Sequence, residues 1–269
     1  MGVFDASGPI HALVVGANRG IGLGLVQRLL HNNPGSGDHP GSGKLGCSIG
    51  TVYATYRQIA SPQLQALLEQ HPDRLRIIPM DITQETQIAQ GIAQIQAQTG
   101  RLHLTVYCVG ILHEGNLQPE KSLQQIQANH LMHYFQVNSI GAVLLARYIL
   151  PLFKHGEQSV FASISAKVGS IGDNRLGGWY GYRASKAALN MLMRTVAIEY
   201  SRKSPKTIVV MLHPGTTDTR LSEPFQRNVS PEQLFSVERT ATQLLQVIEG
   251  LQPEDSGAFF SWDGSQLPW

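Results

Sequence analysis

Tyr182 and Lys186 lie four residues apart, in the segment Tyr-Arg-Ala-Ser-Lys, and apolar residues at helical spacing follow them. Positions i and i+4 share one face of a helix, so an ammonium group is expected one turn from a phenol. An isolated tyrosine titrates near ~10, and a neighbouring cation lowers that pKa. The pair is therefore a candidate proton donor and acceptor at neutral pH. Two surface residues sharing a helix face by chance would give the same pattern, so other parts of the chain must decide.

A glycine-rich segment follows the first apolar run. Residues 16–22 are Gly-Ala-Asn-Arg-Gly-Ile-Gly; they follow the apolar run Ile10–Val15 and precede apolar residues at helical spacing. Strand, glycine turn and helix in this order are typical of dinucleotide sites, because glycines let backbone N–H groups approach a pyrophosphate at a helix N-terminus. We therefore predict that the cofactor is bound here by Gly16, Asn18, Arg19, Gly20, Ile21 and Gly22.

Arginines mark the end of the second predicted strand, residues 48–55. In dinucleotide sites an acid at this point accepts from the ribose 2′-OH, whereas an arginine suits a 2′-phosphate. The chain has Arg57 here and no acid, and Arg19 lies in the glycine turn. Two guanidinium groups favour NADP(H) over NAD(H), although both arginines could instead face solvent.

Polar residues also follow the later predicted strands, residues 75–80, 102–109, 159–165 and 207–212. The residue after the first of these, Asp81, can accept from an adenine amine or cap the next helix. Hydroxyl groups after the last one can bind a cofactor amide or phosphate, or form an ordinary turn. The candidate residues at these strand ends are Asp81, Ile82, Gly110, Ser165, Pro214, Gly215, Thr217 and Thr219.

The order of elements predicts an α/β fold. Helices are expected over residues 61–71 (Ser61 as N-cap), 84–98, 129–150 (ended by Pro151), 182–200 and 230–250, with a last strand over 258–262. Alternating strands and helices predict a single-domain, Rossmann-type doubly wound parallel sheet of about seven strands, with helices on both faces. Residues 1–269 form this one domain, and the Gly/Ser/Pro-rich stretch 32–46 is expected to be a flexible surface loop. Ligands bind such sheets outside the carboxyl ends of the strands, where all the candidate residues fall.

Composition narrows the classes of function. The net charge of +2 over 269 residues is far from that of a nucleic-acid binder. The two cysteines, Cys47 and Cys108, form no disulfide framework or metal pattern, and we expect a cytoplasmic protein. No signal peptide and no apolar run of about twenty residues is evident, so no membrane association is expected. His130 and His133 lack a third ligand, and no metal is expected.

Taken together, these residues resemble the short-chain dehydrogenase/reductase family. The resemblance rests on Gly16-x3-Gly20-x-Gly22 and Tyr182-x3-Lys186, and residues 168–186 resemble the C-factor-like branch related to carbonyl reductases. It implies that Tyr182 exchanges a proton with the substrate oxygen as hydride moves to or from nicotinamide. Lys186 would bind the ribose and lower the tyrosine pKa, and Asn138 would help to hold a proton-relay water. It also places Asp81 and Ile82 by the adenine, and Thr217 and Thr219 by the amide or phosphates.

The chain departs from this family pattern at three places. Val15 stands where the family usually has Thr, and Tyr-Cys-Val-Gly110 replaces Asn-Asn-Ala-Gly. The position of the family's catalytic serine is occupied by Ala166. Its neighbour Ser165 should point to the opposite face of a regular strand. Ser165 could turn inward at the strand end, Ser170 could substitute for it, or the site could lack the serine; we predict Ser165 as the donor.

The leading hypothesis is an NADPH-dependent oxidoreductase that transfers hydride between nicotinamide and a small carbonyl or alcohol substrate, with Tyr182 as general acid and base beside Lys186. The alternative is an NAD(P)-binding regulatory or signalling protein with weak or no turnover, which the alanine at 166 favours. The resemblance implies a homodimer or homotetramer. The substrate pocket is expected from the loop 111–120 and the segment after Thr219, including Phe225 and Phe235.

Overall fold

The computed structural model describes residues 4, 8–32 and 45–269. Most of the predicted loop 32–46 lies outside these residues, but its two ends are described. The buried Asn32 side chain donates to the carbonyl oxygens of Leu45 and Cys47 at 3.3 and 2.8 Å, and accepts from the Leu45 N–H at 2.9 Å. One amide therefore holds the two ends of this stretch together.

Seven parallel strands form the central sheet, in the order β3-β2-β1-β4-β5-β6-β9. Their bounds are β1 Ile10–Val15, β2 Ile49–Tyr56, β3 Leu75–Pro79, β4 Leu104–Tyr107, β5 Ser159–Ile164, β6 Thr207–His213 and β9 Phe259–Ser261. The two-residue strands β7 (Thr216–Thr217) and β8 (Leu234–Phe235) pair separately. The predicted doubly wound sheet is confirmed, and its strand order reverses between β1 and β4. Such a switch point is where ligands bind in these folds.

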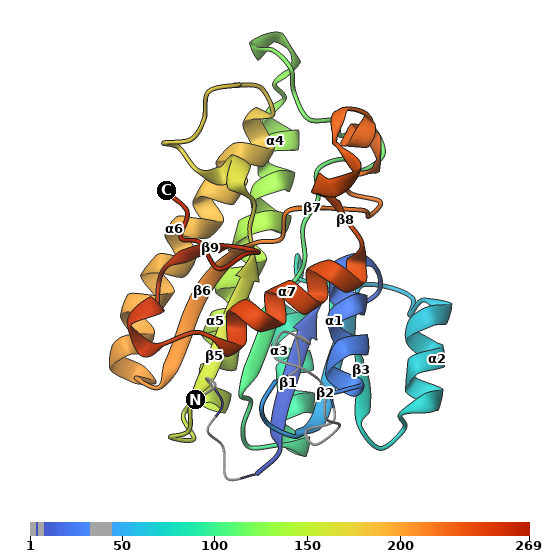
Figure 1. Ribbon diagram of the computed structural model, residues 1–269, viewed down its shortest axis with the longest axis vertical. Helices are drawn as coiled ribbons and strands as arrows, with labels where there is room; N and C mark the ends of the chain where they lie inside the picture. The colour runs from blue at the N-terminus through green and yellow to red at the C-terminus, as the bar shows by residue number, and fades with distance from the viewer. Residues whose placement is uncertain (1–3, 5–7, 33–44) are drawn as a thin grey trace.

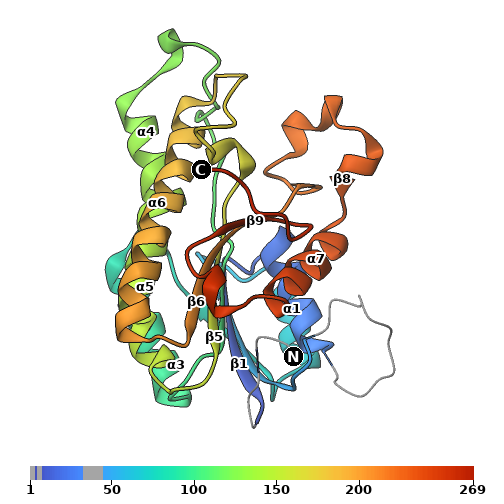
Figure 2. The same ribbon diagram turned by 60° about the vertical axis from the view of Figure 1, so that its left-hand side comes forward.

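Helices cover both faces of the sheet (Figures 1 and 2). One apolar core includes residues of α1 (Gly20–Leu30), α2 (Pro62–Gln70) and α7 (Val237–Glu249); the other includes residues of α3 (Glu85–Gln98), α5 (Gly141–Phe153) and α6 (Tyr180–Lys203). Alternate residues of β1 enter the two cores, Val14 the first and Leu13 the second. Burial on both faces explains why the strands are nearly continuous apolar runs rather than alternating ones.

One long helical segment runs from α4 (Ala128–Phe135) through a π-helical turn at Gln136–Ile140 into α5. The predicted end at Pro151 is wrong. The helix continues to Phe153 because the side chains of Leu152 and Phe153 are buried in the core. By length and hydropathy this segment could cross a membrane, but half of its most apolar window is buried inside the fold. Its apolar character is therefore explained by packing against the sheet.

The predicted helix over 230–250 begins later than expected. Pro231–Gln233 form a 3-10 turn, and Leu234–Phe235 form β8. The cap of α7 is Ser236, whose Oγ accepts from the Arg239 N–H at 3.1 Å. Ser230 and Pro231 are residues typical of a helix start, but the pairing of β8 with β7 delays the start of the helix. By contrast, Ser61 caps α2 as predicted, accepting from the Leu64 N–H at 3.2 Å.

Candidate active site

The glycine turn joins β1 to α1 at the carboxyl edge of the sheet. Gly16 and Gly20 have φ of +84° and +54°, values that favour glycine. A Cβ on Gly22 would lie 2.2 Å from the Gly16 carbonyl oxygen, so only glycine fits there. The turn is thus as tight as a pyrophosphate-binding turn requires, and α1 begins within it, at Gly20.

Two predicted cofactor residues, Asn18 and Arg19, lie within this turn. The Asn18 side chain donates to the Ile59 carbonyl at 2.9 Å and accepts from the Ser61 N–H at 2.6 Å, which ties the turn to the segment after β2. Arg19 precedes α1; burial lowers the pKa of its guanidinium, and the charges of Arg220 and Arg57 lower it further. Positive charge therefore gathers where the sequence predicts a 2′-phosphate.

Asp81 follows β3 as expected, in a turn rather than as a helix cap. Its Oδ1 accepts from the Thr83 N–H at 2.9 Å and from the Thr83 hydroxyl at 2.8 Å. Gln84 occupies the N-cap position of α3. Of the two roles considered for Asp81, helix capping is excluded by this arrangement. Ile82 is buried beside Gly141.

Tyr182 and Lys186 share the inner face of α6, near its N-terminus. They are only 6% and 3% exposed, and the Lys186 ammonium lies 5.9 Å from the centroid of the Tyr182 ring. Lys186 Nζ donates to the Ile164 carbonyl at the end of β5, at 3.0 Å. The two chemical groups are therefore brought together in a buried place at the carboxyl edge of the sheet.

The pKa of Tyr182 differs from the sequence-based expectation. Burial lowers the pKa of Lys186 to about 8 and raises the pKa of Tyr182. We expected the ammonium to lower the tyrosine pKa. In this structure burial disfavours the phenolate, and the Lys186 ammonium is directed at the Ile164 carbonyl.

Asn138 lies at the centre of the π-helical turn and is fully buried. Its Oδ1 accepts from the Ile111 N–H at 2.7 Å, and its Nδ2 donates to the Ile111 carbonyl at 3.0 Å and to Ser185 Oγ at 2.9 Å. Ser185 Oγ in turn donates to the Tyr182 carbonyl at 2.8 Å. Asn138 is therefore a buried, hydrogen-bonded residue and not a surface position. π-helical turns are frequent at functional sites, and this one links the loop after β4 to the helix of Tyr182.

Gly110 makes room for these groups. A Cβ at this position would lie 3.3 Å from Lys186 Nζ and 3.5 Å from Asn138 Oδ1. The first contact is tight and the second is an ordinary van der Waals contact, so a side chain here would crowd the Lys186 ammonium. Glycine at this position therefore leaves room for the ammonium beside the loop after β4.

Ser165 is directed away from Tyr182. Its hydroxyl donates to Asn190 Oδ1 at 2.6 Å, and Asn190 lies eight residues, or about 12 Å of helix rise, beyond Tyr182. The side chain of Ala166 instead packs in the apolar cluster that contains Tyr182. Ser170 is buried and accepts from the Asp173 N–H at 3.2 Å. The geometry contradicts an inward-facing Ser165, because strand alternation persists, and favours a site without the family serine.

Of the predicted cofactor residues after β6, only some lie against the glycine turn. The Thr217 hydroxyl is buried and shares a 2.8 Å hydrogen bond with the Thr240 hydroxyl of α7, so it does not face a ligand. Thr219 lies against the glycine turn, since a Cβ on Gly20 would be 3.3 Å from its Cγ2. Pro214 and Gly215 form the turn that joins β6 to β7, and Gly215 has φ of +71°.

An apolar cluster surrounds the Tyr182 ring. Tyr134 and Trp179 contact it edge-on, with ring centroids 6.4 and 6.2 Å away, and Trp179 contacts Phe225 at 4.9 Å. Phe225 therefore belongs to the apolar cluster around Tyr182. Phe235 packs elsewhere, with its ring 4.8 Å from that of Trp262. Other members of the cluster are Ile111, Leu112, Leu117, Ala166, Val168 and Leu221.

Glu120, which holds the start of α6, was not predicted from the sequence. Its carboxylate is buried, and Oε2 accepts from the Gly181 N–H at 3.1 Å, while its carbonyl accepts from the Trp179 N–H. A carboxylate at a helix N-terminus is stabilised by the helix dipole. Trp179 has φ of +51°, an uncommon conformation for a bulky residue. A buried acid that caps a helix from sixty residues away leaves no local sequence signal.

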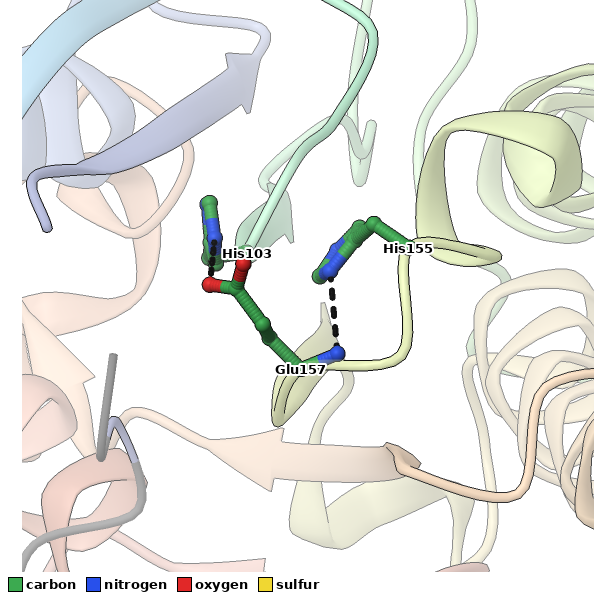
Figure 3. A group of neighbouring side chains, drawn as sticks. All are labelled: His103, His155 and Glu157. Carbon is green, nitrogen blue, oxygen red and sulfur yellow. Dashed lines mark hydrogen bonds and ion pairs between the residues drawn. The ribbon is translucent and has the colours of Figure 1, made fainter. Parts of the chain in front are cut away.

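Within the described part of the chain, one group of side chains has the spacing of a metal site: His103, His155 and Glu157, at the amino end of the sheet (Figure 3). The His155 ring bonds to the Leu102 carbonyl and the Glu157 N–H. His103 Nδ1 accepts from the His11 N–H, and its Nε2 lies 3.1 Å from Glu157 Oε2. Arg101 holds the other carboxylate oxygen. The ligand atoms are engaged in hydrogen bonds, so the group is explained as a structural clasp.

Because it contains His103, this clasp should make the stability of the fold depend on pH. Burial lowers the pKa of His103 to about 4, below its unfolded value near 6.5, so the unfolded chain binds more protons between these limits. Stability should therefore fall as pH drops from 6.5 to 4, by up to about 3 kcal/mol from this residue. Urea titrations of wild type and His103→Gln at several pH values in this range measure the free energy of unfolding and so test this prediction. The variant should lose less stability over the interval; an identical pH dependence would contradict the assignment.

The chain is similar to known proteins in both sequence and structure. The family model described as short chain dehydrogenase matches residues 44–230. The chain belongs to the short-chain dehydrogenase/reductase family. An uncharacterized oxidoreductase of Schizosaccharomyces pombe is 26% identical over 95% of this chain and 96% of its own. The C-signal protein of Myxococcus xanthus is 33% identical over half of this chain and 76% of its own.

A solved structure of an NADPH-bound carbonyl reductase from chicken fatty liver is similar throughout. It shares 28% identity with this chain and a TM-score of 0.79, and the match covers 97% of this chain and all of that one. The predicted resemblance to the C-factor-like and carbonyl-reductase branch is confirmed. The chain is thus an oxidoreductase of the short-chain family with a carbonyl-reductase-like fold.

Proposed function

We propose that this protein is an NADP(H)-dependent reductase of small carbonyl compounds that uses Tyr182 as its general acid. The observation that carries the proposal is the buried pair of Tyr182 and Lys186 at the carboxyl edge of the sheet, across from the glycine turn. The similarity to an NADPH-bound carbonyl reductase supports the choice of cofactor and reaction. Reduction is tested by following NADPH oxidation over a panel of aldehydes and ketones.

The residues present fit a dinucleotide. The positive φ of Gly16 and Gly20 and the close approach of Gly22 to the Gly16 carbonyl form the tight turn before a helix that binds phosphate groups in such folds, and Gly110 keeps space beside Lys186. When bound, the nicotinamide cofactor supplies the hydride. Arg19 and Arg57 would bind the 2′-phosphate, and Lys186 would bind the nicotinamide ribose.

Tyr182 delivers its proton from the phenol oxygen to the substrate oxygen. The raised pKa keeps this phenol protonated at neutral pH, as a general acid must be before it acts. The Lys186 ammonium then stabilises the phenolate that remains, because an adjacent cation favours the charged form. Asn138 holds the loop after β4 against α6 and so fixes the position of both groups.

The apolar cluster around Tyr182 excludes water from the substrate carbonyl, and Trp179 and Phe225 favour substrates with an apolar group. Ala166 supplies no hydroxyl to the substrate oxygen. This absence also supports the competing hypothesis, a dinucleotide-binding regulatory protein with weak or no turnover. The oligomeric state implied by the family resemblance stays a prediction.

Arg57→Gln should weaken NADPH binding more than NADH binding. A charged hydrogen bond to a phosphate contributes about 1.5–3 kcal/mol, so the Kd for NADPH should rise by roughly 10- to 100-fold. NADH lacks the phosphate, and its Kd should change by less than about twofold on the same scale. Fluorescence titrations with both cofactors measure this. Arg202→Gln, an exposed arginine in the last turn of α6, is the matched control. Equal losses for the two cofactors would contradict the assignment.

A further inference from the structure

Glu114, in the loop after β4, holds the arginine assigned above to the 2′-phosphate. Its Oε1 accepts from both Nη1 and Nη2 of Arg57, each at 3.2 Å. Its Oε2 lies 3.1 Å from His133 Nε2 of α4. The Glu114 carboxylate thus occupies the two N–H donors of Arg57. A guanidinium uses these same donors to bind phosphate with two parallel hydrogen bonds.

The surroundings of Glu114 are rich in positive charge. Arg220 and Arg57 both lower the pKa of the Arg19 guanidinium, and Glu114 acts on it in the opposite direction. The hydrogen bond from His133 and the contact with Arg57 lower the pKa of Glu114, so this carboxylate is ionised at neutral pH. The charges of Arg220, Arg57 and Glu114 therefore all act on Arg19, in the region where a phosphate dianion is expected to bind.

The loop carrying Glu114 also reaches the opposite side of this region. His113, the preceding residue, donates from Nε2 to the Arg220 carbonyl at 3.0 Å. Arg220 follows Thr219, whose side chain lies against the glycine turn. Two consecutive residues thus attach the loop to the end of β2 on one side and to the segment after β6 on the other. The loop spans the region in which the cofactor phosphates are expected.

We propose that Glu114 determines the affinity for the phosphorylated cofactor by competing with its 2′-phosphate for Arg57. This inference rests on the proposed function. The two side chains are 54% and 40% exposed, so their ion pair contributes little stability and can open readily. NADP(H) can bind Arg57 only when the carboxylate has left it, whereas NAD(H) has no phosphate and needs no such release.

Equilibrium titrations of NADPH and NADH with wild type and Glu114→Gln test this directly, at low ionic strength where exposed charges are least screened. Freeing Arg57 should lower the Kd for NADPH by about three- to fivefold, the range expected for an exposed ion pair. The Kd for NADH should change by less than about twofold. Glu254→Gln, which removes the same charge from an exposed site beyond α7, should leave both constants unchanged.

A double-mutant cycle with Arg57→Gln separates competition from a general charge effect. If Glu114 acts through Arg57, its substitution should tighten NADPH binding less in the Arg57→Gln background. Weaker NADPH binding by Glu114→Gln would show that the pair clasps the bound cofactor, and would overturn the inference. An unchanged Kd would overturn it as well. Failure of wild type to bind NADPH at all would instead overturn the proposed function, so the two failures are distinguishable.

Discussion

Tyr182→Phe should reduce the rate of carbonyl reduction by about 10²- to 10⁴-fold, the contribution typical of a positioned general acid. The phenyl ring keeps the edge-on contacts with Tyr134 and Trp179, so the fold should be preserved. The Kd for NADPH should change by less than about twofold, because only the proton donor is removed. Steady-state NADPH oxidation and fluorescence titration measure the two quantities on the same preparation.

Tyr180→Phe is the control for this variant. Tyr180 lies two residues earlier on the same helix, is more than a third exposed, and lacks the four-residue spacing to Lys186. Its substitution should leave the rate within about threefold of wild type, as is usual for surface changes away from the site. Full activity of Tyr182→Phe with every reducible carbonyl would contradict the assigned mechanism.

Ala166→Ser should increase kcat by about tenfold or more. Removing one hydrogen-bond donor from an oxyanion site typically costs 10²- to 10³-fold, and adding one at an unrefined position should recover part of that. The alanine packs in the cluster that contains Tyr182, so a hydroxyl there has access to the substrate oxygen. Single-turnover reduction of the best carbonyl substrate by both proteins measures the effect.

Ser165→Ala provides the paired test. Because Ser165 bonds to Asn190, this variant should leave kcat within about threefold of wild type. It should lower the free energy of unfolding by about 1–3 kcal/mol, since the buried amide oxygen of Asn190 loses its donor. A large loss of kcat in Ser165→Ala, together with no gain in Ala166→Ser, would restore Ser165 as the substrate's hydrogen-bond donor.

Local patterns explain why much of this fold could be predicted. The apolar runs of β1 and β6, the glycine turn and the Ser61-Pro62 helix start each have a short-range physical signal. The start of α7 could not be predicted in this way. Ser230 and Pro231 have the same local chemistry as a true cap, and only the pairing of β8 with β7 moves the start to Ser236.

The candidate site was predictable in its residue types but not in its contacts. The spacing of Tyr182 and Lys186 brought the right groups together, but spacing carries no information on burial, which raises the tyrosine pKa. The sequence left three outcomes open for the family's serine, and the residue that binds the Ser165 hydroxyl, Asn190, lies on α6, far from Ser165 in the sequence. Glu114 and Glu120 act through contacts across the fold, which no local pattern reveals.

The most direct test of the central claim is hydride transfer itself. Wild type is incubated with NADPH deuterated at the transferred position of the nicotinamide and with its best carbonyl substrate, and the product alcohol is analysed by mass spectrometry. We predict one deuterium on the carbinol carbon and a rate that depends on Tyr182. NADPH binding without deuterium in any product, over a broad panel of aldehydes and ketones, would contradict the claim and identify a dinucleotide-binding protein that does not catalyse reduction.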